Sequence, residues 1–300
     1  MSKPTATKTR QLAFIGLGVM GLPMAGHLLS AGHALKVHTR TKAKAKSLTG
    51  QGATWAATPA NAADGADVVF LCVPDTPDVE KVLLGGDGVI TTLRKGAIVV
   101  DHSTISPSAT RGFAKQLAAK GAKLLDAPIS GGDVGARNGT LSIMVGGDES
   151  AFKSIEPLLR HMGTTVTYCG VSGNGQLTKL VNQVLVTVTN LAVCEALVFG
   201  KRNGLDLEKT IAALAGGAAG SWQLANLGPR MIKHDLKPGF TIDLQQKDLK
   251  IVLATAEESN TSLPAASLVH QLFTAAQAAG HGKDGTQALY TVLEKLASLH

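Results

Sequence analysis

A glycine-rich motif near the start of the chain constrains its fold more than any other feature. Residues 16–21 read GLGVMG, an unbroken G-x-G-x-x-G, and they directly follow the apolar stretch 11–16. A helical pattern comes next, and a second apolar stretch, 34–39, follows Gly32. Strand, glycine turn, helix and strand within about thirty residues is the context of a dinucleotide-binding βαβ unit. The motif therefore predicts a Rossmann-type fold in which backbone amides at a helix N-terminus bind a pyrophosphate. The residues expected to bind the cofactor here are Gly16, Leu17, Gly18, Val19, Met20 and Gly21.

The residues after the second strand indicate which dinucleotide is bound. An acidic residue there would accept hydrogen bonds from the ribose 2′-hydroxyl, but the chain reads HTRTK over 38–42 and has no acid. Arg40 and Thr41 can instead donate to a 2′-phosphate. We expect NADP(H) to be favoured over NAD(H). The alternative is an exposed basic loop.

Strands and helices continue to alternate after this unit. Residues 67–73 (DVVFLCV) form a continuous apolar run of the kind found in parallel strands buried on both faces, and 97–100 and 123–125 repeat the scheme. Further closing strands are expected over 139–147 and 164–170, with a helix over 149–162 between them. The first half is therefore predicted to be a doubly wound α/β domain.

Polar turns follow these strands at the expected carboxyl edge of the sheet, where open α/β sheets bind ligands. Val73, Pro74 and Thr104 are the cofactor contacts expected there. His102 lies in the same region, but the pattern favours a structural histidine over an acid–base residue.

Beyond residue 170 the strand signals fade and helical patterns take over. A long apolar helix is expected over 173–200. Shorter helices are expected over 206–215, 221–232, 244–259, 265–279 and 286–299. We therefore predict a dinucleotide-binding domain over 1–171 and an all-α domain over 172–300, with an interdomain helix over 172–200.

Polar residues interrupt the long apolar helix at helical spacing. Lys179, Asn182 and Gln183 lie at i, i+3 and i+4 and share one face, with Asn190 about two turns further along. Such residues are costly in lipid, so a buried helix is favoured over a membrane span. Two interpretations remain for this face: solvated turns at a helix start, or an active-site lysine with orienting amides.

Two further segments are candidate ligand contacts. In DAPISGG, a serine hydroxyl and two glycine amides (Ser130, Gly131 and Gly132) can form an oxygen-binding nest suited to a small carboxylate. The alternative is a glycine-rich turn. Gln, Lys and Asp cluster over 245–248 just after Phe240, where a polar first helical turn is the simpler interpretation.

Composition excludes several classes of function. The chain is 44% hydrophobic and 17% charged, as in ordinary globular proteins. Aromatic residues make up only 4%, and the net charge of +7 is spread along the chain, which argues against nucleic-acid binding. The three scattered cysteines indicate reduced thiols in the cytoplasm, and no Cys/His cluster suggests a metal site. Residues 1–10 are too short and polar for a leader peptide.

Taken together, these motifs resemble those of the β-hydroxyacid dehydrogenase family, which includes the 3-hydroxyisobutyrate dehydrogenases. GLGVMGLPMAGHL is similar to that family's opening signature, DAPISGG with GTLSIMVGG to its substrate segment, GNGQLTKLVNQ to its catalytic helix, and PGFTIDLQQKDL to a later contact segment. The match covers essentially the whole chain. Within the family, Asn182-Gln183 and GGAAGSW resemble the tartronate semialdehyde reductases most. His27 departs from a common asparagine, and Arg40 from the acid of NAD-preferring members.

The resemblance implies a role for each matching residue. Lys179 would be the general acid–base residue, protonating the aldehyde oxygen as hydride arrives. Substrate contacts would come from Ser130, Gly131, Gly132, Asn182, Gln183, Phe240 and Asp248, and Lys247 would contact the cofactor. No metal is implied.

We therefore expect a homodimeric or homotetrameric oxidoreductase that reduces tartronate semialdehyde to glycerate, with no nucleic-acid or membrane partner. The alternative within the class is a 3-hydroxyisobutyrate or other short 3-hydroxyacid dehydrogenase, or a glyoxylate–succinic semialdehyde reductase. Imine reductases are disfavoured because they lack the lysine present here as Lys179. The alternative from another class is a non-catalytic nucleotide-binding module.

Overall fold

The computed structural model describes residues 10–299. The chain divides into two compact units, unit 1 (Met1–Lys179) and unit 2 (Leu180–His300), and the division falls within one long helix, α8 (Asn174–Arg202). Residues 1–9, which carry most of the expectation about a leader peptide, lie outside the described part of the chain.

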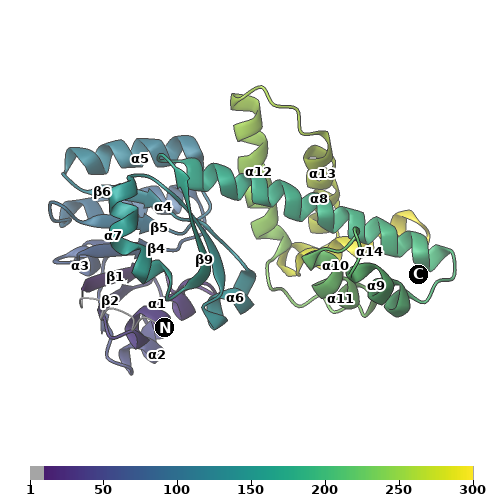
Figure 1. The fold of residues 1–300 in the computed structure, drawn as a ribbon, viewed down its shortest axis with the longest axis horizontal. Helices are drawn as coiled ribbons and strands as arrows, with labels where there is room; N and C mark the ends of the chain where they lie inside the picture. Colours follow the sequence, from purple (N-terminus) through teal and green to yellow (C-terminus); the bar gives the residue numbers. More distant parts are fainter. Residues whose placement is uncertain (1–9, 300) are drawn as a thin grey trace. The chain divides into compact units, whose positions relative to one another are not determined.

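Unit 1 is built on one mostly parallel sheet (Figure 1). Its strands are β1 (Gln11–Ile15), β2 (Ala34–His38), β3 (Thr54–Trp55), β4 (Val68–Leu71), β5 (Ile98–Asp101), β6 (Lys123–Asp126), β7 (Ile129–Ser130), β8 (Leu141–Gly146) and β9 (Gly163–Gly170). Their spatial order is β3-β2-β1-β4-β5-β6-β8-β7, with β9 paired to β8. The first six positions reproduce the dinucleotide-binding order 3-2-1-4-5-6, so the chain reverses direction across the sheet between β1 and β4.

Both faces of this sheet are covered, because the continuous apolar strands have no polar side to expose. On β1, Leu12 and Phe14 pack into one buried cluster, and Ala13 and Ile15 pack into a second cluster on the other face. The described helices of unit 1 before α8 are α1 (Gly21–Ser30), α2 (Lys46–Thr49), α3 (Pro59–Ala63), α4 (Thr76–Leu84), α5 (Pro107–Ala119), α6 (Gly132–Asn138) and α7 (Glu149–Leu159), with short 3₁₀ turns at Lys42–Ala45 and Val89–Thr91.

These elements confirm the predicted doubly wound α/β fold. Each strand expected from an apolar run is present, with ends that differ by at most two residues. Two short strands were not expected, β3 and β7. Two-residue strands carry no periodicity, so pairing with β2 and with β8 defines them and the sequence pattern does not.

Unit 2 is helical, as expected. Besides the rest of α8, it contains α9 (Leu207–Ala215), α10 (Trp222–Asn226), α11 (Gly228–Ile232), α12 (Ile242–Glu258), α13 (Pro264–Ala278) and α14 (Leu289–Leu296), with 3₁₀ turns at His281–Lys283 and Thr286–Ala288. The single helix expected over 221–232 is broken at Leu227. Pro229 follows there, so its missing N–H and its ring favour a new helix start.

Helix α8 is long and apolar enough to cross a membrane by length and composition alone, but half of that apolar window is buried inside the structure. Leu191, Cys194 and Leu197 belong to the buried core of unit 2, together with Phe273 and Tyr290. These contacts are those of a core helix.

Candidate functional site

The glycine turn after β1 has three glycines in three different environments. A Cβ on Gly16, whose φ is +99°, would meet the Cys72 carbonyl oxygen at 2.1 Å, so the end of β1 lies directly against the end of β4. A Cβ on Gly21 would meet the Gly16 carbonyl oxygen at 1.9 Å. A Cβ on Gly18 would meet nothing within 4 Å, so this glycine faces open space. This is the arrangement that lets a pyrophosphate approach the backbone, and α1 has no acid in its first turn to repel it. The turn therefore fits a dinucleotide.

The loop after β2 is basic and exposed. The Arg40 side chain is 83% exposed, and its Nη1 lies 3.8 Å from Asp78 Oδ1. Thr41 is exposed and precedes a short 3₁₀ turn, and Lys42 Nζ lies 4.6 Å from the centre of the Trp55 ring. A solvent-exposed ion pair of this kind contributes little free energy, so Asp78 holds Arg40 only weakly.

The segments after β4 and β5 are joined to each other by hydrogen bonds. Val73 N donates to Ser103 Oγ at 2.9 Å, and Ser103 N donates to Asp101 Oδ1 at 2.9 Å. Val73 and Thr104 are half-buried at this edge, and Pro74 is exposed. The structure therefore brings these three expected cofactor contacts to the carboxyl ends of adjacent parallel strands.

His102 is buried in the sheet. Its ring stacks on Phe70 with centroids 5.8 Å apart, and its Nδ1 lies 2.7 Å from the Ala127 carbonyl oxygen. Since that carbonyl can only accept, Nδ1 carries the proton. Burial lowers the pKa of His102 to about 4, and the hydrogen bond to Ala127 opposes this shift without cancelling it. These contacts confirm the structural interpretation.

The serine–glycine nest lies where β7 gives way to α6. Ser130 pairs with Ser142 in the antiparallel ladder of β7 and β8. Gly131 and Gly132 follow with φ of +125° and +62°, and both are exposed. A Cβ on Gly132 would meet nothing within 4 Å. The positive φ of both glycines and the open space beside Gly132 leave room for a small oxyanion.

The N-terminus of α8 is fixed to the sheet by Asp126, at the end of β6. Gly173 N donates to Asp126 Oδ1 at 2.8 Å, and Gln176 N donates to Oδ2 at 2.9 Å. The carboxyl group is fully buried. Burial raises its pKa, and the backbone hydrogen bonds from Gly173 and Gln176 oppose that shift.

Gln176 fixes the same helix end a second time. Its Nε2 donates to the Ser103 carbonyl oxygen at 2.8 Å, and its Oε1 accepts from Ile105 N at 3.1 Å. Lys179 follows one turn later and is only 7% exposed. Lys179 is therefore not solvated, and the interpretation of this helix start as solvated turns is wrong at that residue.

Unit 2 contains the other polar residues expected at the site, joined in a network. Asn182 Nδ2 donates to Gln183 Oε1 at 2.8 Å, and Gln183 Nε2 donates to Asp248 Oδ2 at 2.6 Å. Asp248 Oδ1 lies 2.7 Å from Lys247 Nζ. The structure thus brings Asn182, Gln183, Lys247 and Asp248 together.

Several of the polar side chains near the start of α12 are buried. Gln245, Gln246 and Asp248 are all buried, which the interpretation of 245–248 as a polar first helical turn does not explain. Phe240 is half-buried just before this helix, and its carbonyl oxygen accepts from Thr286 N.

Asp126 and Gln176 were not singled out from the sequence. Asp126 opens the DAPISGG segment and Gln176 lies in GNGQLTK, so each belongs to a motif in which other residues were predicted to contact ligands. A signal was available: an ionisable residue directly after an apolar strand must find partners if it is buried. Nothing local shows that these partners lie 47 and 50 residues away.

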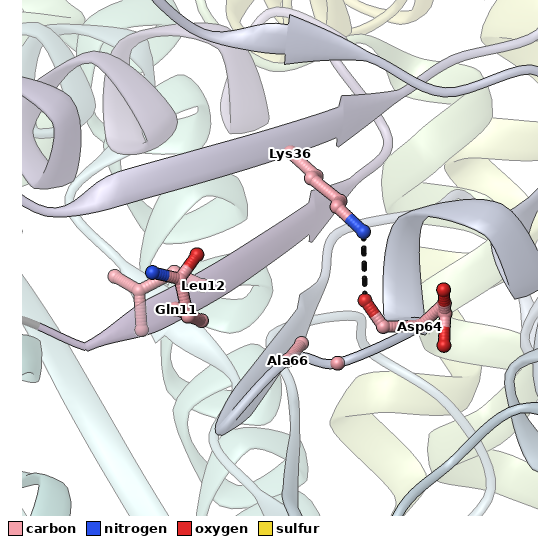
Figure 2. Close-up of a pocket in the computed structure, with 6 residues that line it drawn as sticks. Gln11, Leu12, Lys36, Asp64 and Ala66 are labelled. Carbon is pink, nitrogen blue, oxygen red and sulfur yellow. Dashed lines mark hydrogen bonds between the residues drawn. The ribbon is translucent and has the colours of Figure 1, made fainter.

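A small cavity of about 110 Å³ lies at the opposite end of β1 from the glycine turn. It is lined by Gln11, Leu12, Lys36, Asp64, Gly65 and Ala66. Figure 2 shows Lys36 Nζ bonded across it to the Asp64 carbonyl oxygen, a distance of 2.7 Å. Ligand pockets usually measure roughly 300–1,000 Å³, so this cavity is too small for a dinucleotide. Over residues 10–299, no group of three or more His, Cys, Asp or Glu side chains could hold a metal ion.

Comparisons with known proteins agree with this geometry. Residues 11–170 match the family described as the NAD binding domain of 6-phosphogluconate dehydrogenase. Residues 173–293 match the family described as NAD-binding of NADP-dependent 3-hydroxyisobutyrate dehydrogenase.

Individual relatives match over nearly the whole chain. The 2-hydroxy-3-oxopropionate reductase of Escherichia coli is 43% identical, with 96% of this chain and 98% of that protein covered. The crystal structure of 3-hydroxyisobutyrate dehydrogenase from Salmonella typhimurium has a TM-score of 0.85 at 31% identity, covering 94% of this chain and 99% of that one. A structure of Psf3 in complex with NADP⁺ and 2-OPP has the same TM-score at 29% identity, covering 94% and 99%.

Both halves of the chain match models of nicotinamide-dependent dehydrogenases, and the sheet order and glycine turn have the form that such a cofactor requires. The chain therefore belongs to the 3-hydroxyisobutyrate dehydrogenase-related family of β-hydroxyacid dehydrogenases, and it is an NAD(P)-dependent oxidoreductase of that family.

Proposed function

We propose that this enzyme reduces a small carboxylate-bearing semialdehyde, specifically tartronate semialdehyde to glycerate, reversibly and with NADPH. The observation that carries the proposal is Lys179, a buried lysine in the second turn of a helix whose first turn is bound to the dinucleotide-binding sheet. Buried ionisable side chains cluster at functional sites, so the burial of this lysine supports a role in catalysis.

Each residue has a proposed role in this reaction. Lys179 Nζ donates a proton to the aldehyde oxygen and takes it back in the reverse direction. Ser130, Gly131 and Gly132 hold the substrate carboxylate, and Asn182 and Gln183 orient its hydroxyl or carbonyl group. Phe240 and Asp248 are further substrate contacts. Bound nicotinamide supplies the hydride, so the protein itself contributes positioning, charge stabilisation and the proton.

The proposed cofactor contacts lie in the glycine turn and in the segments after β2, β4 and β5, with one further residue in α12. The backbone of residues 16–21 carries the pyrophosphate, Val73, Pro74 and Thr104 border the dinucleotide, and Lys247 is a further contact. The proposed preference for NADPH rests on Arg40 and Thr41. Arg40 is exposed and only loosely paired with Asp78, so a 2′-phosphate can recruit it without burying or stranding a charge.

Two relatives of this chain are named for different substrates of one class. A 43% identical relative is named for 2-hydroxy-3-oxopropionate, while a structural neighbour is a 3-hydroxyisobutyrate dehydrogenase. One methyl or hydroxyl group distinguishes such substrates, and a few side chains read that difference. A 3-hydroxyisobutyrate or other short 3-hydroxyacid dehydrogenase, or a glyoxylate–succinic semialdehyde reductase, is the second candidate within the class.

We also propose the remaining properties expected from the sequence. These are domains spanning 1–171 and 172–300, a cytoplasmic location and a homodimer or homotetramer. The proposal of an oligomer is supported by apolar side chains that α8 leaves exposed, among them Val181 (61%), Leu185 (64%) and Phe199 (70%).

A steady-state screen tests the proposed reaction. Tartronate semialdehyde, glyoxylate, succinic semialdehyde and methylmalonate semialdehyde are each assayed with NADPH and NADH. We expect the highest kcat/KM with tartronate semialdehyde and NADPH. Turnover of none of these substrates with either cofactor would contradict the proposal.

The cofactor preference is tested by Arg40→Asp. Because the variant removes charge-assisted hydrogen bonds and adds a like charge, we expect kcat/KM for NADPH to fall on the order of 10- to 100-fold, with a much smaller change for NADH. Equal losses for the two cofactors would show that Arg40 does not read the 2′-phosphate.

A further inference from the structure

The helix that carries Lys179 is joined to the sheet through a buried carboxylate. Asp126 Oδ1 and Oδ2 each accept one backbone N–H of the first turn of α8, from Gly173 at 2.8 Å and Gln176 at 2.9 Å. Helices are usually capped by a residue of their own N-terminus. Here the acceptor comes from the end of β6, so the bonds fix the helix relative to the sheet and do more than close its first turn.

The backbone around this carboxylate is packed without spare room. A Cβ on Gly175 would lie 2.5 Å from the Met144 carbonyl oxygen and 2.6 Å from that of Asp126. A Cβ on Gly146 would lie 2.6 Å from Gly175 N and 2.7 Å from Asp126 Oδ2. These contacting atoms belong to the backbone or to a buried carboxylate, so moving them aside would cost considerable free energy. The helix start is therefore held at one position on β6 and β8.

Gln176 links the same turn to the segment after β5. One amide group both donates to the Ser103 carbonyl oxygen and accepts from Ile105 N, so it brackets Thr104. Ser103 in turn accepts from Val73 N. Thr104 and Val73 are proposed cofactor contacts, so the turn that precedes Lys179 is bonded to the backbone on which the cofactor is proposed to lie.

We propose that Asp126 and Gln176 are positioning residues that set the place of Lys179 relative to the carboxyl edge of the sheet. This inference rests on the proposed function of Lys179 as the proton donor. Neither residue contacts the reacting atoms. Their contribution is geometric, and a displacement of about 1 Å in a catalytic group can cost on the order of 100-fold in rate.

A carboxylate that only caps its own helix should not affect the position of Lys179. Unit 1 contains such a residue, Asp148, which serves as a matched control for Asp126. Asp148 caps α7 in the same unit by accepting from Ala151 N at 2.8 Å, three residues along its own helix. It is partly exposed and also paired with Lys123. Asp148→Asn therefore changes a helix cap without changing how α8 meets the sheet.

The primary variants are Asp126→Asn and Gln176→Met. Asp126→Asn keeps the shape of the side chain but replaces one acceptor with an NH₂ group that faces a backbone N–H. Gln176→Met keeps the volume but removes both of its side-chain hydrogen bonds. Gly175→Ala displaces the same turn by steric contact and tests the geometry without altering either side chain.

We expect each variant to lower kcat on the order of 10- to 100-fold while the dissociation constant for NADPH changes by about twofold or less. Asp148→Asn is expected to leave kcat within about twofold of wild type. NADPH binding, followed by nucleotide fluorescence, shows that the dinucleotide unit is folded. Wild-type kcat in both Asp126→Asn and Gln176→Met would overturn the inference.

A double-mutant cycle with Lys179→Ala separates positioning from a general structural effect. If Asp126 acts through Lys179, adding Asp126→Asn to Lys179→Ala should lower kcat by about twofold or less, because no proton donor remains to be misplaced. An undiminished loss in that background, with Lys179→Ala itself lowering kcat on the order of 10²- to 10⁴-fold, would overturn the positioning role and leave the proposed function standing. Near-wild-type activity of Lys179→Ala would instead refute the proposed function.

Discussion

His102 shows how a single buried side chain relates stability to pH. Its Nδ1–H donates to the Ala127 carbonyl oxygen, while its Nε2 is buried and has no hydrogen-bond partner. Protonation would place a charged N–H at that buried, unpartnered position. The ring is therefore held neutral, and burial lowers its pKa from 6.5 to about 4.

The sign of the resulting pH dependence follows from which state binds the proton more tightly. The unfolded chain takes up this proton near pH 6.5 and the folded protein only near pH 4. The free energy of unfolding should therefore be unaffected by His102 above about pH 6.5 and fall as the pH drops to about 4, by about 3 kcal/mol in all. Urea unfolding of wild type and His102→Leu between pH 7.5 and 4 measures this. The variant should show a shallower slope, and identical slopes would contradict the assignment.

The glycine turn is the element on which cofactor binding depends. Its glycines differ in what a side chain would meet, and Gly18 alone among Gly16, Gly18 and Gly21 faces open space. Gly18→Ala should therefore fold normally yet obstruct the approach of the pyrophosphate to the backbone. We expect the dissociation constant for NADPH to rise by about tenfold or more, which corresponds to about 1.4 kcal/mol.

The matched control is Gly26→Ala within α1, where the added Cβ would make an ordinary 3.8 Å contact with Leu48. Alanine is the better helix former, so stability should rise or stay level and NADPH affinity should not change. Calorimetric titration of both variants with NADPH measures the difference. Equal affinity in Gly18→Ala and Gly26→Ala would show that the pyrophosphate lies elsewhere.

The positions of helices and strands were predictable where the sequence has a long apolar segment or a distinctive turn motif. The strands of the parallel sheet and the long helix α8 follow from apolar runs, and the βαβ unit follows from its glycines. The break at Leu227 and the short strand β7 were missed because each depends on a few residues: a proline within an otherwise helical pattern, and pairing with β8. Local periodicity does not encode such pairings.

At the scale of the whole molecule, the sequence located the candidate residues but not the groups that hold them. Lys179, Asn182 and Gln183 stood out because polar residues at helical spacing are unusual on an apolar helix, and Asp248 was expected from the family resemblance. The anchoring of α8 by Asp126 and Gln176 could not be derived, since its partners are separated by 47 to 73 residues. The burial of Gln245 and Gln246 was missed for the same reason.

The most direct test of the account is the rate of semialdehyde reduction by Lys179→Ala at saturating NADPH. If Lys179 donates the proton, kcat should fall on the order of 10²- to 10⁴-fold, the usual contribution of general acid–base catalysis, while the dissociation constant for NADPH stays at the wild-type value. A kcat within a few-fold of wild type would contradict the central claim that this buried lysine carries the chemistry.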